Sequence, residues 1–78
     1  SADRSERLAE MSGFEAARRA RLQRQYKAVT EIIESGNDAE ALAALARIGR
    51  DAPEFADVWF SIAKIEHKNK KLERINRL

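Results

Sequence analysis

The sequence predicts an all-α protein, with three main helices packed as antiparallel neighbours in a single small domain over residues 1–78. Large apolar side chains recur three and four residues apart, which is the spacing of one helix face. Charged residues make up 36% of the chain, and Gly and Pro are scarce, a composition typical of helices with solvated outer faces. A chain of 78 residues supports one modest core, so stabilisation by a partner or by oligomerisation is expected.

The first main helix is predicted over residues 13–35. Its apolar face steps by four, three and four residues through Leu22, Tyr26, Val29 and Ile33. Residues 12–15, Ser-Gly-Phe-Glu, lie at the start of this helix and have the form of a capping box, in which Ser and Glu each bond the other's backbone amide. Either a helix restarts here, leaving residues 1–11 as a short or frayed leading helix, or one long helix passes through with a weak point at Gly13. The capping box favours the restart.

The second helix is predicted over residues 38–49. Gly36 is placed to take the left-handed conformation that ends the first helix, and Asn37 or Asp38 caps the next one. Five alanines surround Leu42 and Leu45, which favours close approach of a neighbouring helix. Gly49 is expected to stop this helix.

The third helix is predicted over residues 52–77, with Pro53 in its first turn, where amides are unpaired anyway. A polar run over residues 67–71 would allow a turn and a short fourth helix. One continuous helix is favoured, because a seam with a spacing near 3.5 residues runs through Val58, Ile62, Ile65, Asn69, Leu72 and Asn76. The centre of the core is expected to contain Tyr26, Val29, Ile33, Leu42, Leu45, Phe55 and Trp59.

Residues 22–66 resemble a tetratricopeptide repeat, or a half-a-tetratricopeptide repeat. The resemblance lies in a small residue, a large apolar residue and a Pro at family spacing, followed by an aromatic-led helix that ends in Ala-x-x-Glu: Ala41, Leu45, Pro53, Trp59, Ile62, Ala63 and Glu66. The family's first Trp position holds Gln25, and the second repeat is cut short. The resemblance implies paired antiparallel helices and a binding role, and it names no ligand.

The sequence lacks the combinations of residues that a catalytic, cofactor or metal site needs. There is no Cys, His67 is the one histidine and lies among lysines, and the three glycines are isolated. We therefore expect a protein without enzymatic activity, cofactor, metal or small-molecule substrate. No apolar run is long enough to span a bilayer, and a cytoplasmic location with no membrane partner is expected.

Two basic clusters stand out although the net charge is only +2. Residues 16–30 hold five basic side chains and no acid, and residues 64–78 hold six basic side chains and two acids. Helical geometry spreads the first cluster around the axis and turns Arg18 towards the apolar side, where it needs a carboxylate from Glu15 or another helix. In the second cluster Lys64, Lys68 and Lys71 share one face, opposite the apolar seam, and no exposed aromatic side chain is interleaved with them.

The apolar side chains at the end of the chain leave two arrangements open. Leu72, Ile75 and Leu78 are either exposed beyond the core or folded back on Leu8 and Met11. Exposed, they would need a partner.

The favoured function is a non-catalytic protein–protein interaction module, a small adaptor or regulator. Its expected contact residues are Lys68, Lys71, Leu72, Arg74, Ile75 and Leu78. One alternative is a nucleic-acid or ribosome-associated protein that uses the basic clusters 18–27 and 64–77, with contacts from Arg19, Arg21, Arg24, Lys64, Lys68 and Lys71. A second alternative is a self-assembling helical homo-oligomer that uses the same tail surface on two copies.

Overall fold

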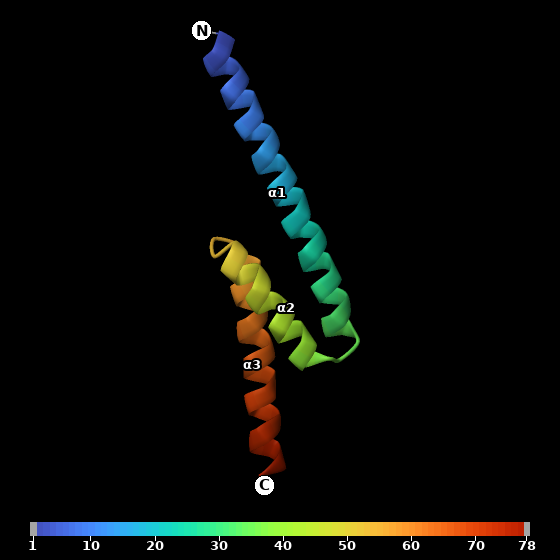
Figure 1. Ribbon diagram of the computed structural model, residues 1–78. Coiled ribbons are helices and arrows are strands. Elements are labelled where there is room, and N and C mark those ends of the chain that lie inside the picture. The colour runs from blue at the N-terminus through green and yellow to red at the C-terminus, as the bar shows by residue number, and fades with distance from the viewer. Residues whose placement is uncertain (1, 78) are drawn as a thin grey trace.

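The computed structural model describes the backbone of residues 2–77 and the side chains of Glu10 and residues 12–77. This part of the chain contains three α-helices and no strand: α1 (Ala2–Glu34), α2 (Asp38–Asp51) and α3 (Ala56–Asn76). The predicted all-α class is therefore confirmed. Figure 1 shows α2 running back along the second half of α1, and α3 running back along α2. The two chain ends lie at opposite ends of a molecule that measures 70 × 19 × 13 Å.

The first helix is continuous, and the predicted restart at residues 12–15 is wrong. Gly13 is exposed and lies within α1, with nothing near the position of a Cβ atom. A glycine inside a helix costs about 1 kcal/mol relative to alanine, and its neighbours are mostly strong helix formers. Because no other element approaches at this point, nothing turns the chain away, and the helix passes through.

The turn between α1 and α2 forms where the sequence predicts it. Gly36 has a φ of 87°, in the left-handed region, and its amide donates to the carbonyl of Ile33. Asn37 is the N-cap of α2: its side-chain oxygen accepts from the Glu40 amide at 3.2 Å, and its side-chain amide donates to the Glu40 carboxylate at 2.8 Å. Of the two predicted caps, Asn37 is therefore the one used.

The predicted boundary between the second and third helices is wrong by several residues. The second helix continues through Gly49 to Asp51, and α3 begins at Ala56. Ala52 has left the helical conformation (φ −140°, ψ 72°), as expected for a residue that precedes proline, because the proline ring disfavours helical backbone there. Pro53 thus lies in a turn between the helices and not in the first turn of α3. The predicted continuity of the last helix is confirmed, because the polar run 67–71 lies inside α3.

The core is small and lies where all three helices meet. Nine apolar side chains in the described part of the chain are buried: Leu22, Val29, Ala41, Ala44, Leu45, Ile48, Ala52, Val58 and Ile65. Two of the predicted central residues, Val29 and Leu45, belong to this set. Four more pack around it partly buried: Tyr26, Ile33, Leu42 and Phe55.

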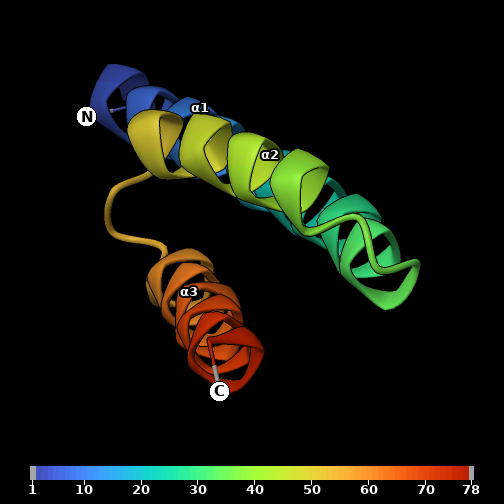
Figure 2. The same ribbon diagram turned by 90° about the horizontal axis from the view of Figure 1, so that it is seen from below.

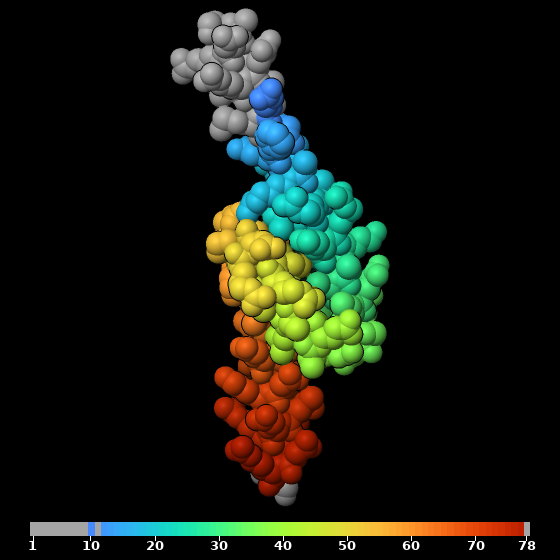
Figure 3. Space-filling view, in the orientation of Figure 1, coloured from blue at the N-terminus to red at the C-terminus, as the bar shows by residue number. Residues whose placement is uncertain are grey.

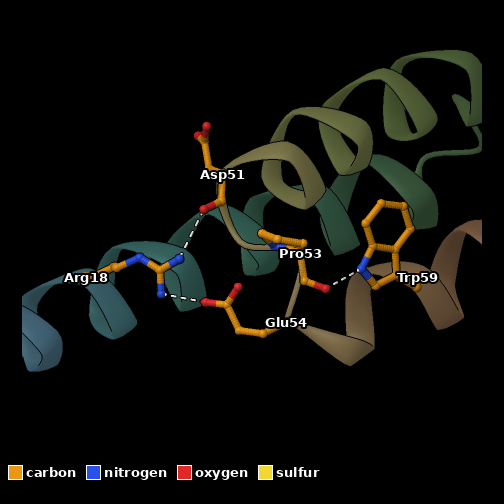
Figure 4. A network of polar contacts seen from close by, with 5 residues as sticks. All are labelled: Arg18, Asp51, Pro53, Glu54 and Trp59. Carbon is orange, nitrogen blue, oxygen red and sulfur yellow. Dashed lines mark hydrogen bonds and ion pairs between the residues drawn. The ribbon is translucent and has the colours of Figure 1, made fainter.

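Trp59 is the exception, because it is 46% exposed and lies at the edge of the core. Its indole Nε1 donates to the carbonyl of Pro53 at 2.8 Å (Figure 4). Its ring also lies against Gly49. The predicted central position of Trp59 is therefore wrong. The ring lies on the outside of the junction between α2 and α3.

One polar contact joins α1 directly to α3. The Tyr26 and Ser61 hydroxyls lie 2.8 Å apart, and Ser61 is buried. The Tyr26 ring also packs against Phe55, with centroids 5.4 Å apart. Figure 2 shows α3 set apart from the α1–α2 pair, and these contacts link α1 to the N-terminal part of α3 and to its N-cap, Phe55.

Candidate functional site

The last part of α3 extends past the rest of the protein. Asp38, the first residue of α2, pairs with Lys68 of α3 at 2.8 Å, and this contact marks the end of the region where the two helices run together. Beyond Lys68 the helix continues to Asn76. Figure 3 shows this red segment projecting from the packed helices with no other element beside it in that view. We call residues 68–77 the α3 tail.

The tail exposes two large apolar side chains that the sequence assigned to a binding surface. Leu72 is 50% exposed and Ile75 is 55% exposed. Leu72 lies seven residues after the buried Ile65, which is two helical turns along the same face, so the buried face of α3 continues into the tail uncovered. Leu72 and Ile75 therefore do not fold back on the start of α1, which lies at the far end of the molecule (Figure 1).

Three of the residues named above lie outside the described side chains. They are Leu8, Met11 and Leu78. The predicted contact role of Leu78 thus stays a prediction.

The basic side chains around Leu72 and Ile75 have different surroundings. Lys71 and Arg74 are exposed. Lys68 is half-exposed, and its ammonium group is held by the Asp38 carboxylate. Lys64, Lys68 and Lys71 are all exposed, but the Lys68 side chain reaches Asp38 at the start of α2, so its charge is already paired. The second carboxylate oxygen of Asp38 is buried without a hydrogen-bond partner, so the pair is incompletely satisfied.

Arg18 has a structural role at the opposite end of the core. Its Nη1 lies 2.7 Å from Oε1 of Glu54, and its Nη2 donates to the backbone carbonyl of Asp51 at 3.0 Å (Figure 4). The sequence required a carboxylate for this arginine, and Glu54 supplies it from the turn between α2 and α3. The pKa of Glu54 is lowered, first by a hydrogen bond from its own backbone amide and then by Arg18.

The remaining basic side chains of α1 are exposed and do not form one face. Arg19, Arg21, Arg24 and Lys27 all lie on the solvent side of the helix. At about 100° per residue, they point in directions at least roughly 60° apart. Among the described side chains none of the four takes part in an ion pair.

One exposed aromatic side chain was missed from the sequence. Phe60 is 67% exposed, and the Lys64 ammonium lies 5.3 Å from its ring centroid. The expectation that no exposed aromatic accompanies the lysines is therefore wrong. The position of Phe60 gives the reason: it lies five residues before the buried Ile65, about 140° around the helix and so on the outer side.

Two shallow grooves flank α1 in the described part of the chain. The larger, about 360 Å³, has a mixed lining: Glu15, Arg18, Arg19, Leu22, Gln23, Glu54 and Phe55. The smaller, about 240 Å³, lies between α1 and α2. Among the described residues, no three His, Asp or Glu side chains come together in an arrangement that could hold a metal ion. No helix in that part of the chain has the length and apolar character needed to cross a membrane.

Comparisons of the chain with protein-family models, with curated proteins and with solved structures found no match.

Proposed function

We propose that this chain is a non-catalytic protein–protein interaction module that docks through the α3 tail. The observation that carries the proposal is the half exposure of Leu72 and Ile75 on a helix segment that extends past every other element in Figure 3. Adjacent exposed apolar side chains on a projecting helix are typical of a surface that a partner covers. Lys68, Lys71 and Arg74 border this surface and would orient the partner.

The partner that fits is an amphipathic helix of another protein with acidic residues beside its apolar strip. Residues 64–77 carry six basic side chains and two acids, so an acidic partner is attracted and a basic one is repelled. An apolar strip on the partner would cover Leu72 and Ile75 in the manner of helix pairing.

A second copy of the chain fits this surface less well. Two copies of the same tail would place basic segments side by side.

The test uses two synthetic amphipathic helical peptides with the same apolar strip. One has Glu on both flanks of the strip, and the other has Lys at the same positions. We expect calorimetry to detect binding of the Glu peptide with a Kd in the micromolar range, on the order of −8 kcal/mol, and no binding of the Lys peptide. In the double variant Leu72→Gln/Ile75→Gln the Glu peptide should bind at least tenfold more weakly.

The matched control is Phe14→Gln, which removes a similarly exposed apolar side chain from α1. It should leave peptide binding unchanged, and circular dichroism should show that all variants keep their helix content. Equal binding of the Glu and Lys peptides, or an unchanged affinity in the Leu72/Ile75 variant, would overturn the proposal. A dimer in sedimentation that the same double variant dissociates would replace the foreign partner with a second copy.

A further inference from the structure

A strip of basic and aromatic side chains runs along the outer side of α3. Successive members are four, three, four and three residues apart, so the strip contributes one side chain per helical turn: Phe60, Lys64, His67, Lys71 and Arg74. All five are exposed. The strip lies opposite the buried face that contains Val58 and Ile65, and it extends about 21 Å along the helix. We call it the outer strip.

The charge on this strip is of one sign. The two acids of this part of α3, Glu66 and Glu73, lie roughly 120° or more around the helix from the middle of the strip. Asp57 lies one turn before Phe60, ahead of the first basic residue. No ion pair occupies Lys64, Lys71 or Arg74 among the described residues, whereas Lys68, on the side nearer the core, is bound to Asp38.

Phe60 gives the strip a feature that an ordinary solvated helix face lacks. A phenyl ring that is 67% exposed contributes little to the core, and Lys64 holds a positive charge 5.3 Å from its centroid. The ammonium lies over one face of the ring, and a base that stacks on the other face would have its phosphate close to that ammonium group. Aromatic side chains that stack bases, beside basic groups that follow the backbone, are the common elements of single-strand binding.

We propose that the outer strip of α3 binds single-stranded nucleic acid. Phe60 stacks a base, and Lys64, Lys71 and Arg74 contact successive phosphates, while His67 offers a second ring two turns from Phe60. Paired bases are stacked inside a duplex and cannot reach the ring, so single strands are preferred. The strip has no group placed to read a particular base or a 2′-hydroxyl, and RNA and DNA single strands should bind alike. This surface is separate from Leu72 and Ile75, although Lys71 and Arg74 border both.

The experiment is fluorescence anisotropy with labelled oligouridylate and oligodeoxythymidylate, each roughly 12 nucleotides long, over a salt series. Three phosphate contacts predict that log K falls with log salt with a slope of about −2. Phe60→Leu should weaken binding about tenfold and leave the slope unchanged, because it removes a stacking face and no charge. Lys64→Gln should reduce the slope by about 0.7.

Lys70→Gln is the matched control, since it removes one exposed charge from the same helix outside the outer strip. It should leave the slope unchanged, and Leu72→Gln/Ile75→Gln should bind the oligonucleotides as the unaltered protein does. The proposal is overturned if no binding occurs at low salt, if a duplex binds as tightly as the single strands, or if Phe60→Leu has no effect. An equal loss for Lys70→Gln and Lys64→Gln would reduce the interaction to general charge attraction and would also overturn it.

Discussion

The indole ring of Trp59 lies directly against Gly49. A Cβ atom built at Gly49 would come within 2.9 Å of two carbons of that ring, which is closer than real Cβ atoms approach. The indole N–H of the same ring donates to the carbonyl of Pro53 (Figure 4). Gly49 and Trp59 thus form one packing feature, in which a missing side chain on α2 makes room for a large one on α3.

This contact predicts that Gly49→Ala destabilises the protein. Alanine in a helix is normally more stable than glycine by about 1 kcal/mol, but here the methyl group must displace the Trp59 ring or the backbone of α2. Overpacking of this kind costs roughly 1–3 kcal/mol, so the net free energy of unfolding should fall. Urea unfolding followed by Trp59 fluorescence measures both the loss and any change in the environment of the ring.

Gly13→Ala is the matched comparison, since Gly13 is an exposed helical glycine with open space around the Cβ position. It should raise stability by roughly 0.5–1 kcal/mol. Equal effects of the two substitutions would show that the ring does not constrain position 49.

The hydroxyl pair of Tyr26 and Ser61 should couple α1 to α3 measurably. Tyr26→Phe leaves the Ser61 hydroxyl buried without its 2.8 Å partner, which should cost roughly 1 kcal/mol. The double variant Tyr26→Phe/Ser61→Ala removes both groups and should recover part of that loss. A double-mutant cycle by chemical denaturation gives the coupling free energy, and additive losses would mean that the hydroxyls do not interact.

The three helices were predictable because they are determined by local features of the sequence. Apolar spacing and the Gly36–Asn37 turn are fixed by neighbouring residues, and the structure has both. The predicted restart at residues 12–15, inside α1, failed because a capping box at Ser12 takes effect only where the chain leaves the helix. Near Gly13 no other element makes it do so.

The exposure of the candidate surfaces depends on how far α2 extends along α3, and no local sequence pattern contains that information. The exposure of Leu72 was one of two open alternatives, because the same helix face is buried at Ile65 and uncovered two turns later. The partner of Lys68 and the exposure of Phe60 were both missed for the same reason. Arg18 was the easier case, since a charge on an apolar face requires a partner wherever the fold places one.

The ion pair between Lys68 and Asp38 should distinguish Lys68 from the other lysines of α3. Lys68→Gln removes the cation from a mostly buried carboxylate whose second oxygen is already without a partner. Lys70→Gln removes an exposed charge that has no carboxylate partner among the described residues. We expect the first substitution to lower the free energy of unfolding by roughly 0.5–1 kcal/mol more than the second, as measured by urea titration. Indistinguishable values would show that the pair does not contribute in solution.

The contact between Arg18 and Glu54 should make part of the stability depend on pH. The pKa of Glu54 is lowered from its ordinary value of 4.5, first by its own backbone amide and second by Arg18, while desolvation opposes them. The folded state therefore binds this proton less readily than the unfolded chain does. The resulting stabilisation is complete above 4.5 and is lost as the pH falls through the lowered pKa.

Glu54→Gln tests this linkage, because glutamine keeps the size of the side chain and removes the ionisation. Thermal unfolding from neutral pH down to about pH 3 should show the unaltered protein more stable at the upper end and the difference shrinking below pH 4.5. When Arg18→Gln is also present, the effect of Glu54→Gln at neutral pH should become smaller, since Arg18 is one of the two groups that favour the carboxylate. Glu34→Gln, at an exposed acid near the end of α1, controls for general charge effects. A difference between the unaltered protein and Glu54→Gln that stays constant or widens towards low pH would mean that this carboxylate is not stabilised in the fold.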